Sequence, residues 1–169
     1  MGMNRVSARA VWILAVTQTL GYACFYYIFA TLVVQWTADL GWSKPQLAMG
    51  PTLAIVISGS MAPFMGRLID RGYGRLLLTG GSLVGAGALL FLAQAETRTQ
   101  YLAAWAFLGV AQASALYEVC FALIIRRLGD DARRAIIRVT LVAGFASTIA
   151  FPAGAVLSEA YGWLSLIHI

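Results

Sequence analysis

Five long stretches of the chain are almost wholly apolar, and short polar segments separate them. The stretches cover approximately residues 11–35, 45–65, 76–94, 101–125 and 139–158. Each is long enough to cross a hydrocarbon core of about 30 Å as an α-helix, which rises about 1.5 Å per residue. The pattern does not alternate over ten-residue segments, as the strands of a membrane barrel do. We therefore expect an all-α, polytopic membrane protein with five complete transmembrane helices.

Composition makes the lipid bilayer the main partner of this chain. Hydrophobic residues make up 60% of the 169 residues, charged residues make up 11%, and the mean hydropathy is +0.78. A soluble domain of this size cannot cover so much apolar surface. The net charge of +5 does not indicate nucleic-acid binding, because the basic residues lie beside the apolar stretches. Cys24 and Cys120 lie inside apolar stretches, so we expect neither a disulfide nor a metal site.

The basic residues fall mainly on one side of the predicted helices. Only Lys44 and Arg98 lie on the other side. Cytoplasmic segments carry such an excess of Lys and Arg, so we expect a cytoplasmic N-terminus. The composition, rich in Ala, Gly and Arg, is typical of a bacterial gene, which predicts a multi-pass protein of the bacterial inner (plasma) membrane. The ten residues on the cytoplasmic side are Arg5, Arg9, Arg67, Arg71, Arg75, Arg126, Arg127, Arg133, Arg134 and Arg138.

The sequence repeats itself weakly with a shift of 88 residues. Segment 66–74 aligns with segment 154–162, with a Gly, a Tyr and a second Gly in matching positions. The same shift carries the first predicted helix onto the fourth and the second onto the fifth. Because the copies begin on opposite sides of the membrane, the pattern predicts three-helix units repeated with inverted topology, a 3+3 arrangement.

The shift also predicts a sixth helix that begins near Leu164. The chain stops at Ile169, so we expect residues 1–163 to be the N-terminal bundle of a longer protein. We interpret Leu164–Ile169 as the translated end of a sequencing adapter. The alternative is a truncated but authentic start of helix 6.

The loop between the second and third predicted helices carries the most specific motif. Gly66, Asp70, Arg71 and Arg75 match the pattern G-x-x-x-D-R-x-G-x-R in register, whereas Tyr73 stands where glycine is usual. With this loop and the 3+3 repeat, residues 10–163 resemble the major facilitator superfamily. In that family the loop is a conformational latch, whose Asp engages an Arg and a helix N-terminus of the other bundle. The alternative is that Arg71 and Arg75 only follow the charge bias.

The resemblance implies a secondary active transporter of small solutes that works by alternating access of two six-helix bundles. The C-terminal bundle is then missing from this chain. The proton-relay Arg of the drug–proton antiporters is replaced by Trp105. The sequence shows no phosphate-binding loop, metal-ligand cluster or catalytic triad, so we expect no enzyme activity, cofactor or metal. The alternative function is a membrane-embedded enzyme or a helical scaffold subunit.

Glu118 is the only acidic residue deep inside a predicted helix. A charge near the centre of a membrane helix costs about 2.5–3.5 kcal/mol, so its side chain should face the bundle or a water-filled cavity. We expect Glu118 to carry a coupling proton or to contact the solute; a structural hydrogen bond to a neighbouring helix is the alternative. Its predicted helix face carries Ala104, Phe107, Ala111, Ser114 and Ala122.

The first predicted helix offers a second candidate surface. Gln18, Tyr22 and Tyr26 share one face with Phe25 and Phe29. Amphipathic rings that line a cavity suit a small organic solute, although ordinary packing is the alternative. In the fifth predicted helix Thr148 completes the set of candidate pathway residues, on a polar stripe of the kind that more often packs helices together.

Overall fold

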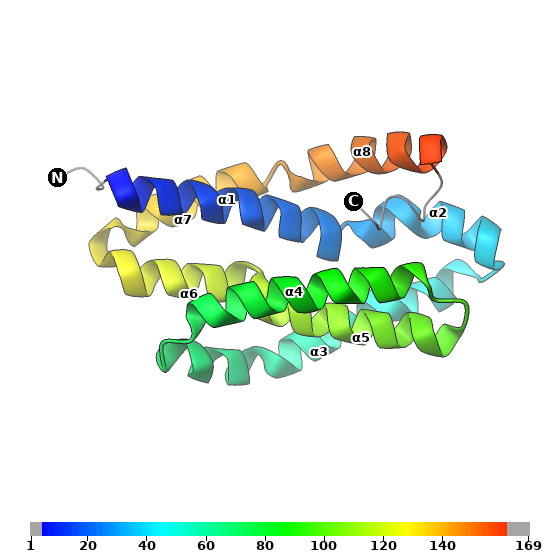
Figure 1. Cartoon of the computed structure of the whole chain (residues 1–169), viewed down its shortest axis with the longest axis horizontal. Coiled ribbons are helices and arrows are strands. Elements are labelled where there is room, and N and C mark those ends of the chain that lie inside the picture. The colour runs from blue at the N-terminus through cyan, green and yellow to red at the C-terminus, as the bar shows by residue number, and fades with distance from the viewer. Residues whose placement is uncertain (1–4, 162–169) are drawn as a thin grey trace.

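The computed structural model of the chain describes residues 5–161, which form a bundle of long, nearly antiparallel helices (Figure 1). No strand occurs in this range, which confirms the all-α prediction. The elements are α1 (Arg5–Phe25), α2 (Ile28–Leu40), α3 (Lys44–Asp70), α4 (Gly74–Ala93), α5 (Arg98–Ala115), α6 (Tyr117–Leu128), the 3-10 turn η1 (Gly129–Asp131), α7 (Ala132–Ala143) and α8 (Ala146–Tyr161).

Three of the five predicted helices are each built from two shorter helices. The first comprises α1 and α2, the fourth comprises α5 and α6, and the fifth comprises α7 and α8. Prolines do not cause these breaks, because Pro51 and Pro63 lie inside α3 and Pro152 lies inside α8. The helices also extend beyond the apolar stretches that predicted them, since polar residues at the membrane surface continue the helical backbone.

The helix ends confirm the inverted repeat in register. The end of α2 at Leu40 and the end of α6 at Leu128 are 88 residues apart. The same separation divides the start of α3 at Lys44 from the start of α7 at Ala132. In Figure 1 α3 runs from right to left, whereas α7 and α8 run from left to right. The two copies are therefore antiparallel, as the 3+3 arrangement requires.

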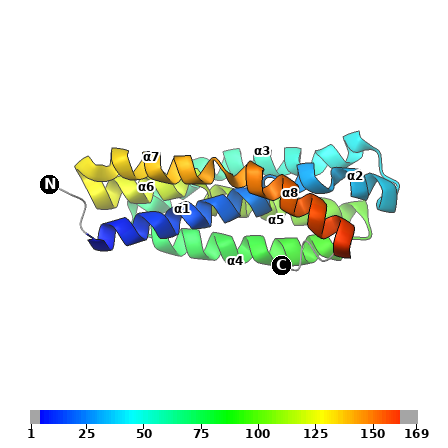
Figure 2. The ribbon, with the colours of Figure 1, turned by 90° about the horizontal axis from the view of Figure 1, so that it is seen from above.

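Helix packing divides the bundle into two groups that meet near its centre. In the first group α5 lies along both α3 and α4, and in the second group α1 and α2 lie along α7 and α8 (Figure 2). Gly109 of α5 allows a close approach to α3, because a Cβ atom there would lie 2.7 Å from the backbone oxygen of Ala54. Trp36, Leu47, Tyr101 and other apolar side chains fill the core around this contact.

The outer surface of the bundle is apolar along its length and basic at one end. Leu83 of α4, for example, is 70% exposed. Four stretches, Ala8–Leu40, Lys44–Asp70, Gly74–Ala93 and Arg98–Val156, are long and apolar enough to cross a membrane. The last of them turns back at η1 and so contains two antiparallel units, α5–α6 and α7–α8. We call such a membrane-length unit, made of one helix or of two consecutive helices, a rod. The α3–α4 turn, the α6–α7 turn and the start of α1, which carry most of the arginines, lie at one end (Figure 1).

Candidate functional site

Two helix breaks lie in the middle part of the bundle, at nearly equivalent positions of the repeat. The first separates α1 from α2, where the N–H groups of Tyr26 and Tyr27 both donate to the Tyr22 oxygen, at 3.1 and 2.9 Å. The second separates α5 from α6 at Leu116, whose φ of −91° and ψ of −162° are extended. A helix end leaves carbonyl groups without helical donors, so each break exposes backbone oxygens that need partners inside the membrane.

Two glutamine side chains supply these partners, and each reaches across to the break in the other rod. Gln112 Nε2 of α5 donates to the Phe25 oxygen at the end of α1, at 2.8 Å. Gln18 Nε2 of α1 donates to the Ala115 oxygen at the end of α5, also at 2.8 Å. Both glutamines are almost fully buried. The two breaks are therefore stabilised reciprocally, through side chains of the opposite repeat unit.

A cluster of tyrosines surrounds the two breaks. The ring centroids of Tyr22 and Tyr117 are 4.5 Å apart, and those of Tyr22 and Tyr26 are 6.1 Å apart. Tyr26 contacts Tyr27 edge-on at 5.4 Å, and Tyr27 contacts Phe151 of α8 at 5.9 Å. The cluster joins α1, α6 and α8, which places the predicted candidates Tyr22 and Tyr26 next to each other.

Glu118 lies beside this cluster, in the first turn of α6. Its side chain is exposed, and it follows Tyr117, whose ring centroid is 4.5 Å from that of Tyr22. A carboxylate at a helix N-terminus is favoured by the helix dipole, which stabilises the charge of Glu118 at the start of α6. Among residues 5–161 no ion pair involves Glu118, since the one recorded joins Arg134 and Asp131 at 3.8 Å.

The break at Leu116 corrects the helix face predicted around Glu118. That face assumed one continuous helix, but the extended residue changes the direction in which α6 presents its side chains relative to α5. Ala104, Phe107, Ala111 and Ser114 belong to α5, so their spacing from Glu118 no longer defines a shared face. Ala122, one turn after Glu118 in α6, keeps the predicted relation.

A cavity of about 280 Å³ opens beside the tyrosine cluster. Its wall consists mainly of aromatic rings, with one amide and no charged side chain. Among the predicted site residues Tyr26 lines this cavity, whereas Thr148 is exposed on α8 and lines neither this cavity nor the next. The lining residues are Tyr26, Tyr27, Phe29, Ala30, Pro51, Ile55, Trp105, Gln112 and Phe151.

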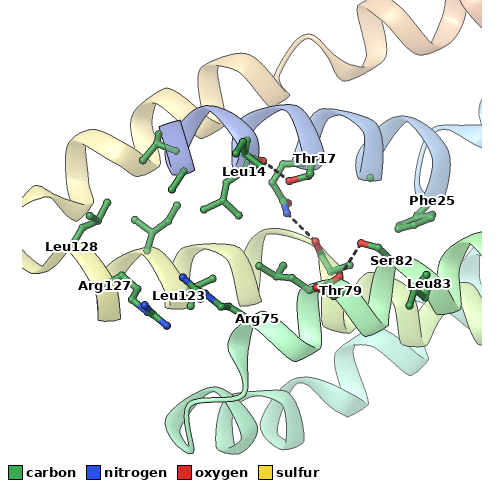
Figure 3. A pocket seen from close by; sticks show the side chains of 18 residues that line it. Leu14, Thr17, Phe25, Arg75, Thr79, Ser82, Leu83, Leu123, Arg127 and Leu128 are labelled. Atoms are coloured by element: carbon green, nitrogen blue, oxygen red, sulfur yellow. Dashed lines mark hydrogen bonds between the residues drawn. The ribbon is translucent and has the colours of Figure 1, made fainter. Parts of the chain in front are cut away.

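A larger cavity of about 630 Å³ lies between α1, α4 and α6 (Figure 3). Its wall is mostly aliphatic, and Arg75 of α4 and Arg127 of α6 lie on one side of it (Figure 3). Gln18 lines this cavity rather than the aromatic one. The Oε1 atom of Gln18 is buried without a hydrogen-bond partner among the described residues. Of the tyrosines with which Gln18 was grouped, Tyr26 lines the aromatic cavity and Tyr22 lines neither cavity.

The predicted latch residues lie at the turn between α3 and α4. Gly66 is inside α3, Asp70 ends that helix, and Arg75 lies in the first turn of α4. Gly72 has a φ of +94°, which favours glycine. Tyr73 has a φ of −80°, so the residue that departs from the motif occupies ordinary backbone geometry. The side chains of Asp70 and Arg71 are exposed.

Arg126 holds this turn from α6. Its Nη1 atom donates to the backbone oxygens of Ile69 and Asp70, both at 2.6 Å. These are carbonyls at the C-terminal end of α3, where a cation is also favoured by the helix dipole. The sequence pattern assigned Arg126 only a role in orientation, because the pairing of α6 with the end of α3 is a tertiary contact.

Gln112 was missed for a similar reason, although a lone amide inside an apolar helix is a signal that could have been used. No group of three or more potential metal-binding side chains forms in residues 5–161.

A search of characterised proteins and a search of solved structures each found no match. The sequence profile of the Major Facilitator Superfamily matches residues 11–169. The chain therefore belongs to the Major Facilitator Superfamily, and it is a multi-pass membrane protein of a family that transports small solutes.

Proposed function

We propose that this chain is the N-terminal bundle of a secondary active transporter that works by alternating access. The observation that carries the proposal is the pair of helix breaks, related by the inverted repeat, beside an aromatic cavity in the middle of the bundle. Discontinuous helices at mid-membrane are a recurring feature of solute sites in transporters. The cavity opens among residues of α2, α3, α5 and α8, and a second bundle would complete it.

We propose a cytoplasmic N-terminus in the bacterial inner membrane. The orientation follows from the basic end of the bundle, where the arginine-rich α3–α4 and α6–α7 turns lie side by side with the start of α1. Cytoplasmic segments carry an excess of Arg and Lys. The protein as a whole would continue beyond Trp163 with helix 6 and a C-terminal bundle. The 88-residue shift supports this continuation, because it pairs the third predicted helix, which begins near Leu76, with a helix that would begin near Leu164.

Within the site we propose Tyr22, Tyr26 and Glu118 as contacts of the solute. Gln18 and Thr148 keep their proposed place along the pathway, with Gln18 also holding the break at Ala115. Glu118 has two roles that fit this position, carrying a coupling proton or contacting the solute. Glu118→Gln separates them, because it preserves solute exchange in the first case and weakens exchange in the second.

For the turn between α3 and α4 we propose the latch role of Gly66, Asp70, Arg71 and Arg75. The Arg126 bonds engage only the backbone of Asp70, and among the described residues no hydrogen bond or ion pair is recorded for its carboxylate. That carboxylate is thus available to a second bundle. A latch that forms in one state only would shift the balance between inward-open and outward-open states.

The test uses the complete protein, expressed from its native reading frame. Asp70→Asn should insert at the wild-type level but change the labelling of single cysteines placed on the two sides, and solute flux should fall. Asp130→Asn is the matched control, because Asp130 is also exposed and lies at the same end of the bundle, in η1. If Asp70→Asn shows the labelling and the solute flux of the wild type, the proposed latch role of Asp70 is wrong. No solute flux by the complete wild-type protein would overturn the transport proposal.

A further inference from the structure

We infer that the aromatic cavity and the neighbouring Glu118 bind an organic cation whose charge is spread over alkyl groups, such as a tertiary or quaternary ammonium. This inference rests on the proposed function, because it names the solute class of the same site. It follows from three features of the structure: the distribution of charge along the bundle, the spacing of the rings and the polarity of the cavity wall.

Charge distribution excludes an anion as the preferred solute of this bundle. Every basic residue among residues 5–161 lies within seven residues of an end of its rod. Glu118, in contrast, lies ten residues before the end of α6 at Leu128. An anion in the cavity would therefore contact no basic side chain and would lie near the Glu118 carboxylate, which is outside the cavity wall. A cation there would meet a carboxylate that has no ion-pair partner among the described residues.

Ring spacing favours a cation with an apolar surface. A cation is attracted to the face of an aromatic ring when it lies within about 6 Å of the centroid. Five of the residues that line the cavity are aromatic. The Tyr26 and Tyr27 centroids are 5.4 Å apart and those of Phe29 and Trp105 are 6.1 Å apart, each pair with edge-on planes. We expect one alkylammonium group in the cavity to contact more than one of these rings. The cluster continues from Glu118, through Tyr117 and Tyr22, to Tyr26 in the cavity wall.

The cavity wall selects against small, strongly hydrated ions. Its polar groups are the Gln112 amide, the hydroxyl groups of Tyr26 and Tyr27 and the indole N–H of Trp105. The amide nitrogen of Gln112 already donates to the Phe25 oxygen. An alkali ion or a primary ammonium would lose its hydration water in this cavity, and the wall does not offer enough oxygen ligands to replace that water. An alkylated ammonium is weakly hydrated, and its methyl groups fit the apolar faces of Phe29, Phe151 and Pro51.

The first experiment compares three probes of similar shape on the complete wild-type protein in lipid nanodiscs. They are phenyltrimethylammonium, its uncharged isostere tert-butylbenzene, and the anion benzenesulfonate. Tryptophan fluorescence reports binding because Trp105 lines the cavity, and protein-free nanodiscs give the partition blank. We expect the cation to bind at least about tenfold more tightly than either other probe. Equal or weaker binding of the cation would overturn the inference without the use of any variant.

The second experiment locates the charge. Glu118→Gln should lower the affinity for phenyltrimethylammonium by about tenfold and leave tert-butylbenzene unchanged. Glu96→Gln is the control, because Glu96 is also exposed but lies in the turn between α4 and α5. Tyr26→Leu should weaken both probes, since it removes a ring from the wall. Unchanged cation binding in Glu118→Gln would overturn the role of the carboxylate.

Failure of this inference and failure of the proposed function give different results. A protein that carries a solute but shows no preference for the cation retains the transport function and loses the organic-cation assignment. A protein that binds the cation selectively but moves no solute across the membrane retains the binding site and loses the transport function.

Discussion

Replacing Gln112 by methionine tests whether the reciprocal hydrogen bonds hold the two helix breaks. Methionine has nearly the same length and volume as glutamine but no N–H donor. The Phe25 oxygen, which receives the 2.8 Å bond from Gln112 Nε2, would then lose its partner at the end of α1. We expect the variant to fold with the same helices but with lower stability.

The size of the loss follows from the environment of the Phe25 oxygen. A buried acceptor left without a partner costs about 1–3 kcal/mol in proteins generally. Hydrogen bonds between transmembrane helices average about 0.6 kcal/mol, with a maximum of about 1.7 kcal/mol. Gln112 is only 5% exposed, so water does not easily replace the amide. We therefore expect a loss of about 1 kcal/mol, which is roughly a fivefold change in the unfolding equilibrium.

The assay is reversible unfolding of the chain in mixed micelles, followed by circular dichroism. Gln94→Met is the matched control, because Gln94 is exposed at the end of α4 and its substitution should change stability by no more than about 0.5 kcal/mol. A double-mutant cycle with Gln18→Met then measures whether the two breaks are coupled. If Gln112→Met and Gln94→Met have the same free energy of unfolding, the amide does not stabilise the break, and the reasoning fails.

Two further predictions concern contacts between the rods. Gly109→Ala should destabilise the bundle by about 1–3 kcal/mol, because its Cβ would lie 2.7 Å from the Ala54 oxygen. Gly87→Ala, which has open space, should instead gain up to about 1 kcal/mol from helix propensity; equal effects in micelle unfolding would contradict the close approach. Arg126→Gln should speed hydrogen exchange in the α3–α4 turn, whereas Arg133→Gln, an exposed arginine of α7, should leave that exchange unchanged. Unchanged exchange in Arg126→Gln would show that its two bonds do not order the turn.

The sequence predicted the rods because hydropathy records the transfer of whole segments into lipid. It also predicted the repeat, because the end of a rod is marked by the same change from apolar to polar residues in both copies. Leu40 and Leu128 illustrate this point, since each is followed by glycine and a polar turn. The loop motif located the α3–α4 turn for the same reason: glycine and charged residues mark a backbone that leaves the membrane.

The breaks escaped prediction because hydropathy does not record where backbone hydrogen bonds go. Tyr26, Tyr27 and Leu116 are apolar or amphipathic residues within continuous apolar stretches, and no proline or glycine marks the two breaks. The interruption is stabilised by amides from the other rod, 87 and 97 residues away in sequence. Nothing local distinguishes these positions from an unbroken helix.

The sequence proposed Glu118 from the cost of a charge inside a membrane helix, and the tyrosines of α1 from their shared helix face. In the structure Tyr22 packs against Tyr117, the residue before Glu118. Phe151 and Trp105, which line the cavity, were not found, because an aromatic residue in a membrane helix is as common on a packed surface as in a solute site. Their assignment required the tertiary structure.

The two glutamines show which part of the break the repeat determines. The 88-residue shift places Gln18 over Ala106 and Gln112 over Cys24, so the donors are not equivalent residues. The breaks nevertheless lie at nearly equivalent positions, Tyr26–Tyr27 and Leu116. The backbone interruption therefore belongs to the three-helix unit, whereas its hydrogen-bond donor is supplied independently in each copy by whichever side chain of the opposite rod reaches the free carbonyl. Because each donor comes from the rod that contains the other break, movement at one break changes the position of the amide that satisfies the other, and the two rods are linked through these bonds.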